Sequence, residues 1–276
     1  MHKNATFAPF FPQPCSTLQM QERIILVTND DGITAKGIRA LVEAVSEFGR
    51  VVVVAPDKPQ SAMGHAITIN QPLRLSRVPI FEGIEAYACS GTPVDCVKLA
   101  TDKLLPRKPD LCVSGINHGS NASINVIYSG TLSAAMEASL ERIPAIGFSL
   151  LDYRADADME TAKQVVKTIV RQLLDNGVPN YHLLNVNIPK ASIEEIKGIR
   201  ICKQGRAKWV ESFDERIDPQ GRKYYWLSGA FLPEEYTEDS DLYALDHNYV
   251  SVVPVQHDLT AYEDIAFLQK NWKLNI

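Results

Sequence analysis

The chain of 276 residues has few cysteines and no long uninterrupted hydrophobic run. Its five cysteines are scattered and never form a CxxC pair, which argues against a disulfide scaffold and a zinc site and favours a reducing compartment. No stretch approaches the roughly 20 apolar residues of a transmembrane helix. We therefore expect a cytoplasmic protein without a membrane partner.

Positive charge is also scarce. The chain has 28 Lys and Arg against 33 Asp and Glu, a formal net charge of −5. It offers no broad basic surface for duplex nucleic acid, although backbone dipoles or a metal ion can still attract a small anion. Motifs of the forms GxGxxG (after the first predicted strand), GxxxxGKS/T and GxSxG are absent, so dinucleotide-binding, P-loop and serine hydrolase functions lack their fingerprints.

The chain does have an alternation of apolar runs and amphipathic segments. Continuous runs typical of strands buried on both faces of a parallel sheet occur at residues 24–27, 51–54, 111–113, 145–148 and 183–187. Helical periodicity follows at residues 38–48, 92–104, 132–140 and 158–176. This order predicts a doubly wound α/β fold with a mostly parallel sheet. The alternation over residues 66–75 predicts a more exposed strand or hairpin arm.

The regular alternation of strand-like and helical segments ends near residue 195. Strand-like pieces at residues 199–202, 223–227 and 249–255 lie among acidic and aromatic loops, ahead of a helix predicted for residues 261–272. We expect an irregular N-terminal extension (1–22), an α/β core (23–195), and a β-rich arm with a C-terminal helix (196–276). The aromatic residues of the arm fit either an interface or a satellite core: Trp209, Tyr224, Tyr225 and Trp226.

Two adjacent acids end the first strand. Asp30 and Asp31 stand between Asn29 and Gly32, where the glycine permits a turn. Two carboxylates about 4 Å apart repel each other by roughly 4 kcal/mol at an effective dielectric of 20, and a divalent cation removes that cost. The alternative is that Asp30 caps the turn and Asp31 faces solvent.

Polar residues follow other strands as well, where open α/β sheets bind ligands. Ser61 and His65 lie in the loop after the second strand, although such side chains are commonly solvated. Asn117, in the polar loop over residues 115–130, offers a neutral oxygen ligand that suits Mg²⁺, Ca²⁺ or Mn²⁺. Residues 128–131 begin a helix, and the free backbone N–H groups at a helix start can bind an anion. The alternative is that these residues only cap the helix. Convergence of these residues at one sheet edge depends on the strand order.

Five segments in this order carry a family resemblance: ILVTNDDG (25–32), VAPDKPQSAMGHAIT (54–68), SGTPVD (90–95), SGINHGSN (114–121) and YSGT (128–131). On these motifs the chain resembles the SurE (survival protein E) family of metal-dependent nucleotidases, from about residue 23 to at least residue 190. The resemblance implies a Rossmann-like core, an arm for homodimer or homotetramer assembly, and one Mg²⁺ or Mn²⁺ per subunit. It implies hydrolysis of nucleoside 5′-monophosphates and often 3′-monophosphates, with some members trimming polyphosphate.

The resemblance also implies site residues. The expected metal ligands are Asp30, Asp31, Ser61 and Asn117, and the expected substrate contacts are Asn29, Asn121, Ser129, Gly130 and Thr131. Asp30, Asp31 and Asn117 are expected to act in catalysis, with one of the two acids orienting or deprotonating the attacking water.

The chain departs from the family pattern at three places. Ala35-Lys36-Gly37 lacks the proline of the common A-P-G, and Ala62 and Ser123 stand where glycines often occur. None of these changes removes an expected ligand. Two other functions stay open: a non-catalytic nucleotide or anion sensor that needs no metal, and a hydrolase of acyl or glycosyl bonds.

Overall fold

The apolar runs of the sequence form a nine-stranded sheet in the order β3-β4-β2-β1-β5-β6-β7-β11-β8. The computed structural model describes residues 22–181 and 183–274, so the predicted extension over residues 1–22 lies, but for Glu22, outside the described residues. The strands of the sheet are β1 (Ile24–Thr28), β2 (Arg50–Pro56), β3 (Leu75–Arg77), β4 (Glu85–Cys89), β5 (Leu111–His118), β6 (Ala145–Leu150), β7 (Leu183–Ile188), β8 (Gly198–Ile201) and β11 (Tyr249–Val255). Only β3 with β4 and β11 with β7 pair antiparallel among them, which confirms the predicted mostly parallel α/β sheet.

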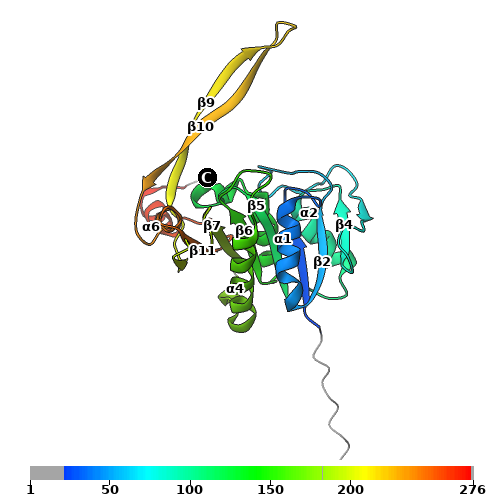
Figure 1. Cartoon of the computed structure of the whole chain (residues 1–276). Helices are drawn as coiled ribbons and strands as arrows, with labels where there is room; N and C mark the ends of the chain where they lie inside the picture. Colours follow the sequence, from blue (N-terminus) through cyan, green and yellow to red (C-terminus); the bar gives the residue numbers. More distant parts are fainter. Residues whose placement is uncertain (1–21, 182, 275–276) are drawn as a thin grey trace, which may run out of the picture.

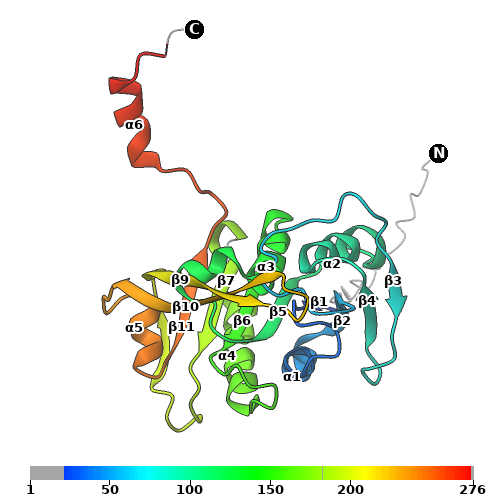
Figure 2. The ribbon, with the colours of Figure 1, turned by 90° about the horizontal axis from the view of Figure 1, so that it is seen from above.

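Helices cover both faces of the sheet (Figures 1 and 2). Helix α1 (Lys36–Val45) packs beside α4 (Glu160–Asn176) on one face, and α2 (Pro93–Leu99) packs beside α3 (Gly130–Leu140) on the other. The predicted helix start at Thr92 is confirmed, because its hydroxyl and the Asp95 carboxylate accept each other's backbone N–H. The shorter helical pieces are η1 (Ser46–Phe48), η2 (Ala100–Leu104), η3 (Ser123–Ile127), η4 (Pro179–Tyr181) and α5 (Asp241–Asp246).

The core fills the space between each helix layer and the sheet. Every residue of β1 is buried, because successive side chains point to opposite faces. Val27 packs in the cluster that includes residues of α1 and α4, and Leu26 packs in the cluster that includes residues of α2 and α3. Gly49 lets the chain return close to the start of β1, since a Cβ there would lie 2.5 Å from the Arg23 carbonyl oxygen.

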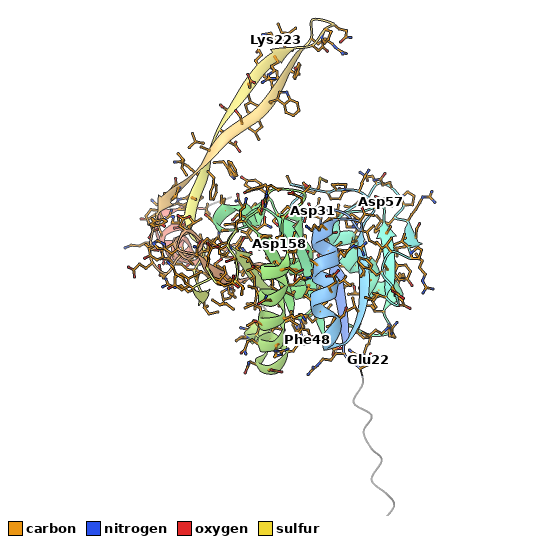
Figure 3. The ribbon with its side chains drawn as sticks, in the orientation of Figure 1. Glu22, Asp31, Phe48, Asp57, Asp158 and Lys223 are labelled. Carbon is orange, nitrogen blue, oxygen red and sulfur yellow. The ribbon has the colours of Figure 1, made fainter. Side chains whose placement is uncertain are left out.

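The strand order creates a topological switch point between β1 and β5. From β1 the chain continues to β2 and β4 on one side, then returns to β5 on the other side, parallel to β1. Asp31, Asp57 and Asp158, which follow β1, β2 and β6, lie at one end of the body in Figure 3. Phe48 and Glu22 lie at the opposite end. Open α/β sheets bind ligands where the carboxyl ends of the strands meet at such a point.

The chain beyond residue 195 divides between the sheet and an arm. The sheet continues past this predicted division, because β11 pairs with β7 and β8 pairs with β11. Strands β9 (Arg206–Ile217) and β10 (Lys223–Glu235) form an antiparallel hairpin that projects from the body (Figure 1). The predicted C-terminal helix is confirmed as α6 (Tyr262–Asn271), which stands off the body in Figure 2 and has no buried residue.

The prediction of a strand over residues 66–75 was largely wrong, since only β3 at Leu75–Arg77 is a strand. The backbone of Ala66 and Thr68 bonds to side chains at the start of α2 and not to a neighbouring strand. The alternating Ile67 and Ile69 therefore stay 49% and 77% exposed.

The polar loop predicted for residues 115–130 is shorter than expected. Strand β5 continues to His118, because it pairs again with β6 at Asn117 and His118 after a register shift. Helical turn η3 then occupies Ser123–Ile127. Within residues 22–181 and 183–274, we find no helix that combines the length and the apolar character needed to cross a membrane.

Candidate active site

Asp30 and Asp31 follow the end of β1 after a single residue, Asn29, and lie at the switch point. Gly32 beside them has a φ of 96°, a left-handed conformation that favours glycine. Asp30 is 5% exposed, and its carboxylate accepts a hydrogen bond from the Thr131 hydroxyl at 2.5 Å. The side chain that closes the turn is Asn29, whose Nδ2 donates to the Gly32 carbonyl at 3.0 Å. The Asp30 carboxylate is thus held by the start of α3.

Burial changes the acidity of both carboxyl groups. Desolvation raises the pKa of Asp30 to about 6; hydrogen bonding from Thr131 opposes the rise, and the charge of Asp31 adds to it. Desolvation also raises the pKa of Asp31, against the opposing effect of His118. A buried carboxylate beside a half-buried one resists joint ionisation, and a bound cation would remove that cost.

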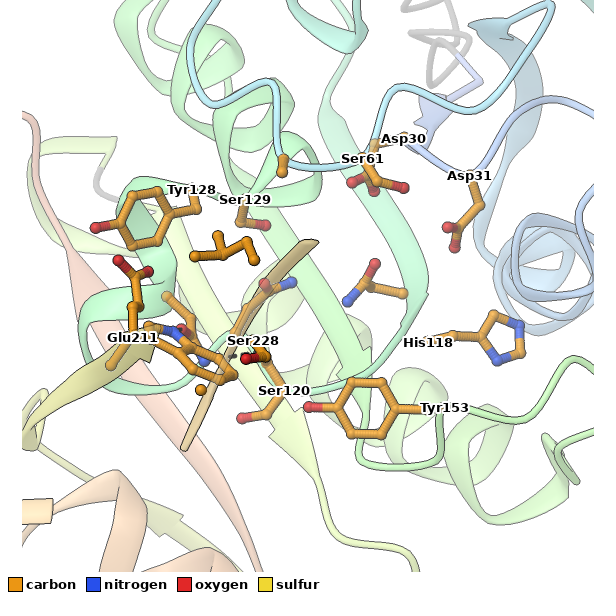
Figure 4. Close-up of a pocket in the computed structure, with 17 residues that line it drawn as sticks. Asp30, Asp31, Ser61, His118, Ser120, Tyr128, Ser129, Tyr153, Glu211 and Ser228 are labelled. Carbon is orange, nitrogen blue, oxygen red and sulfur yellow. Dashed lines mark hydrogen bonds between the residues drawn. The ribbon is translucent and has the colours of Figure 1, made fainter. Parts of the chain in front are cut away.

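The loop after β2 brings Ser61 to the same place. The Gln60 N–H donates to the Asp30 carbonyl at 2.7 Å, which fastens the loop across the end of β1. Figure 4 shows Ser61 next to Asp30. The other residue of this loop that the sequence singled out, His65, is not among the cavity-lining residues, and its Nε2 pairs with Glu137 Oε2 at 2.9 Å.

The end of β5 supplies amide groups. The Asn117 Nδ2 donates to the Gly119 carbonyl at 2.9 Å, which fixes the plane of the Asn117 amide. Asn121 is buried, and its Nδ2 donates to Ser149 Oγ at 2.9 Å while its backbone N–H donates to Asn187 Oδ1 at 2.8 Å. These contacts anchor the loop after β5 to β6 and β7.

The start of α3 points at Asp30. Ser129 is the N-cap, and its hydroxyl accepts from the Leu132 N–H at 3.1 Å. Gly130 allows close approach, since a Cβ there would lie 2.7 Å from the Asp30 Cβ. Thr131 directs both its hydroxyl and its backbone N–H to the Asp30 carboxylate. The helix start therefore already faces one anion, a carboxylate of the protein itself.

A cavity of about 530 Å³ opens beside these groups (Figure 4), within the range of roughly 300–1,000 Å³ common for small-molecule sites. The predicted site residues that line it are Asp30, Asp31, Ser61, Asn117, Asn121 and Ser129. Asn29, Gly130 and Thr131 are not among its lining residues, and they contact the turn or Asp30 from behind.

The sequence did not identify most of the other residues around this cavity. They are Ala62, His118, Ser120, Asn125, Tyr128 and Tyr153 from the body, and Trp209, Glu211, Leu227, Ser228 and Gly229 from the β9–β10 hairpin. Figure 4 shows Glu211 and Ser228 on the side of the cavity away from Asp31. No local pattern in the sequence signals that a distant hairpin reaches the edge of the sheet.

The donor atoms at the body side suit a hard divalent cation. Among the described residues, no group of three or more His, Cys, Asp and Glu side chains could hold a metal, so a zinc-type ligand set is not present there. The set is instead two carboxylates, a hydroxyl and an amide, which match the oxygen preference of Mg²⁺ and Mn²⁺. The buried Oδ2 of Asp31 has no hydrogen-bond partner in the described structure, as expected for an atom that engages an ion.

A family model described as Survival protein SurE matches residues 25–211 of this chain. The chain belongs to the SurE family. The match extends through the β7–β8 connection into β9, so the family region includes the start of the hairpin.

Curated SurE relatives align with nearly the whole chain. The protein named 5′-nucleotidase SurE from Christiangramia forsetii is 59% identical over 260 residues, which cover 94% of this chain and 100% of that protein. The one of the same name from Flavobacterium psychrophilum is 58% identical over 257 residues, covering 93% and 100%. The crystal structure of the SurE protein from Aquifex aeolicus aligns with a TM-score of 0.78 at 40% identity, covering 90% of this chain and 98% of that one.

In this SurE family member, two residues other than glycine adopt left-handed backbone conformations at positions where glycines are common in the family. Ala62 and Ser123 adopt left-handed conformations with φ of 59° and 54°, which glycine adopts more readily. The Ser123 hydroxyl donates to the Gly205 carbonyl at 2.7 Å, which offsets part of the cost. At the position of the missing proline, Lys36 Nζ donates to the Ala157 carbonyl at 2.6 Å and ties α1 to the segment before α4.

Proposed function

We propose that this protein is a metal-dependent phosphomonoesterase that hydrolyses nucleoside 5′-monophosphates to nucleoside and phosphate. The names of the curated relatives support a 5′-nucleotidase. The observation that carries the metal dependence is the meeting of Asp30, Asp31, Ser61 and Asn117 at one end of the cavity. Nucleoside 3′-monophosphates and short polyphosphate carry the same terminal phosphate and are further proposed substrates.

The proposed reaction gives the two carboxylates different tasks. A divalent cation, when bound, neutralises charge on the phosphate oxygens. Thr131 fixes the orientation of the Asp30 carboxylate, so Asp30 serves as a positioned ligand. Asp31 has an oxygen without a protein partner, so it is the group that orients the attacking water and accepts its proton. Asn117 and Ser61 would complete the oxygen set, and Ser129 lines the cavity at the start of α3.

Phosphate release from AMP tests this function. Turnover should require Mg²⁺ or Mn²⁺, stop in EDTA and return when the metal is restored in excess. A protein that binds AMP without releasing phosphate would be the nucleotide sensor, and one that cleaves acyl or glycosyl bonds would be a different hydrolase. Turnover of AMP that persists in EDTA after dialysis would contradict the metal dependence.

We also propose that the protein assembles as a homodimer or homotetramer. The hairpin carries exposed apolar side chains along its length, and the strand register places Phe213, Ile217 and Tyr225 on one face. Exposed apolar side chains that share a face mark interaction sites in soluble proteins.

A further inference from the structure

The two sides of the cavity differ in chemistry. The side formed by the body presents the oxygen atoms of Asp30, Asp31 and Asn117. The side formed by the hairpin presents an indole ring, Trp209, and an aliphatic side chain, Leu227. A cavity with oxygen ligands at one end and an aromatic plane at the other matches a ligand with a phosphate at one end and a flat ring at the other.

Trp209 is held in place before any ligand binds. Its Nε1–H donates to Asn125 Oδ1 at 2.8 Å, which ties the hairpin to η3 of the body. Its ring packs against Phe231 on the paired strand, with ring centroids 5.2 Å apart. The side chain remains 41% exposed and lines the cavity, so a pre-oriented aromatic surface is available to a ligand.

Charge at the hairpin side fixes which way round a nucleotide would lie. Glu211 follows two positions after Trp209 on β9, where side chains two apart share a face, and it lines the same cavity. Its carboxylate disfavours a phosphate near the hairpin, since two anions repel. The phosphate end therefore belongs with the proposed cation at the body, and the base belongs with Trp209.

We infer that the hairpin forms the nucleoside half of the substrate site, and that the Trp209 indole is the platform on which the base stacks. This inference rests on the proposed nucleotidase function and adds the source of its preference for nucleotides over smaller phosphate esters. Because every base has a π face, stacking of this kind tolerates all four bases. Trp209 is thus a specificity-determining residue that takes no part in phosphate chemistry.

The test compares AMP with ribose 5-phosphate, which is the same substrate without its base. Stacking on an aromatic side chain contributes about 1–3 kcal/mol per base, so Trp209→Ala should raise the KM for AMP by about fivefold to 150-fold. The same variant should change kcat/KM for ribose 5-phosphate less than about twofold. Trp209→Phe, which keeps an aromatic face, should lie between Trp209→Ala and the wild type.

Trp226→Ala is the matched control. Trp226 lies on β10 of the same hairpin, is 60% exposed and is not among the cavity-lining residues. The Trp226→Ala variant should leave the ratio of kcat/KM for AMP to kcat/KM for ribose 5-phosphate unchanged. If Trp209→Ala lowers kcat/KM equally for both substrates, or leaves the KM for AMP unchanged, Trp209 is not the stacking surface for the base. Either result would leave the proposed nucleotidase function intact. A wild-type protein that releases phosphate from neither substrate would refute the proposed function and this inference with it.

Discussion

At the scale of single residues, the proposed catalytic role of Asp30 opposes the stability of the fold. Its pKa rises from 3.8 to about 6 on folding because burial disfavours the charged form. The protonated form therefore stabilises the folded state below about pH 4, and this contribution is lost as the pH rises through about 6. At 1.36 kcal/mol per pKa unit, the loss is on the order of 3 kcal/mol for the metal-free protein at neutral pH.

We therefore expect Asp30→Asn to raise the thermal stability of the metal-free protein at pH 8. Asparagine cannot ionise, and its oxygen can still accept from Thr131. Phosphate release should fall by on the order of a hundredfold or more, since even side chains that only orient metal ligands contribute about 10–100-fold. Thermal unfolding in EDTA and phosphate release from AMP measure the two effects.

The same unfolding measurement at pH 4 is the control for Asp30→Asn. At pH 4 Asp30 stays protonated in the folded state and is only partly ionised in the unfolded state, whose pKa is 3.8, so most of the ionisation cost is absent and the advantage of the variant should shrink. If Asp30→Asn raises the thermal stability as much at pH 4 as at pH 8, or is less stable than the wild type at pH 8, ionisation of Asp30 does not limit stability.

At this scale the sequence predicts the residue types of the site better than their contacts. Asp30 and Asp31 lie between an apolar run and Gly32, so their position at a strand end follows from local chemistry. The contact of Thr131 with Asp30 does not, because it depends on Gly130 approaching a strand a hundred residues earlier in the chain. Pairings of that kind are set by tertiary packing.

At the scale of elements, one buried carboxylate fastens the Ser61 loop to helix α3. Glu137 pairs with His65 Nε2 at 2.9 Å and accepts from Lys98 Nζ at 2.5 Å. Burial alone raises the pKa of Glu137, but the hydrogen bonds from His65 and Lys98 outweigh it and lower the pKa below its ordinary value. Since His65 and Ser61 share one loop, the contact with Glu137 restrains the approach of Ser61 to the acids.

We expect His65→Ala to weaken the apparent affinity for Mn²⁺ about tenfold, the size typical of groups that orient metal ligands. The kcat at saturating Mn²⁺ should change little, because the ligands themselves remain. His65→Gln, which keeps a donor, should recover part of the affinity. The measurement is phosphate release from AMP as a function of Mn²⁺ concentration.

Lys98→Met is the matched control for His65→Ala. It removes the other partner of the same carboxylate and leaves the loop attached, so the Mn²⁺ dependence should stay within about twofold of the wild type. Equal shifts in the two variants would show that Glu137 acts through general stability and that His65 has no separate role in holding the loop.

Elements defined by their own residues were predicted well, and those defined by distant partners were not. The start of α2 follows from the reciprocal cap of Thr92 and Asp95, which is local. The alternation of Ile67 and Ile69 imitates a strand, but the backbone on either side of Ile67 bonds to that same cap. The pattern is therefore misleading because the local period says nothing about which partner takes the backbone hydrogen bonds.

At the scale of the whole molecule, the strand order turns separate motifs into one site. The alternating pattern predicts a doubly wound sheet, but not that β1 and β5 are neighbours or that β8 and β11 extend the sheet. The position of the hairpin over the cavity is equally absent from the sequence, because its strands pair with each other and not with the sheet. Long-range order of this kind follows from packing of the complete chain.

The same long-range order leaves α6 exposed on the described part of the single chain. The helix has ten residues, none of them buried, and isolated helices shorter than about 12–15 residues are marginal in water. Tyr262, Ile265 and Leu268 recur every third residue and form an exposed apolar stripe. Burial of this stripe against another subunit would supply the stabilisation that the helix lacks, which ties α6 to the proposed assembly.

We therefore expect light scattering to give the full-length chain a mass two or four times 30.7 kDa. Removal of residues 262–276 should lower that mass or shift dissociation to higher protein concentration. Ile265→Ser with Leu268→Ser, which keeps the length of the chain, should act in the same direction, whereas Lys270→Ser should not, because it leaves the apolar stripe intact. A full-length chain that is monomeric at high concentration would contradict assembly. A truncated chain of undiminished oligomeric state would instead place the interface on the hairpin, where Phe213 is 69% exposed.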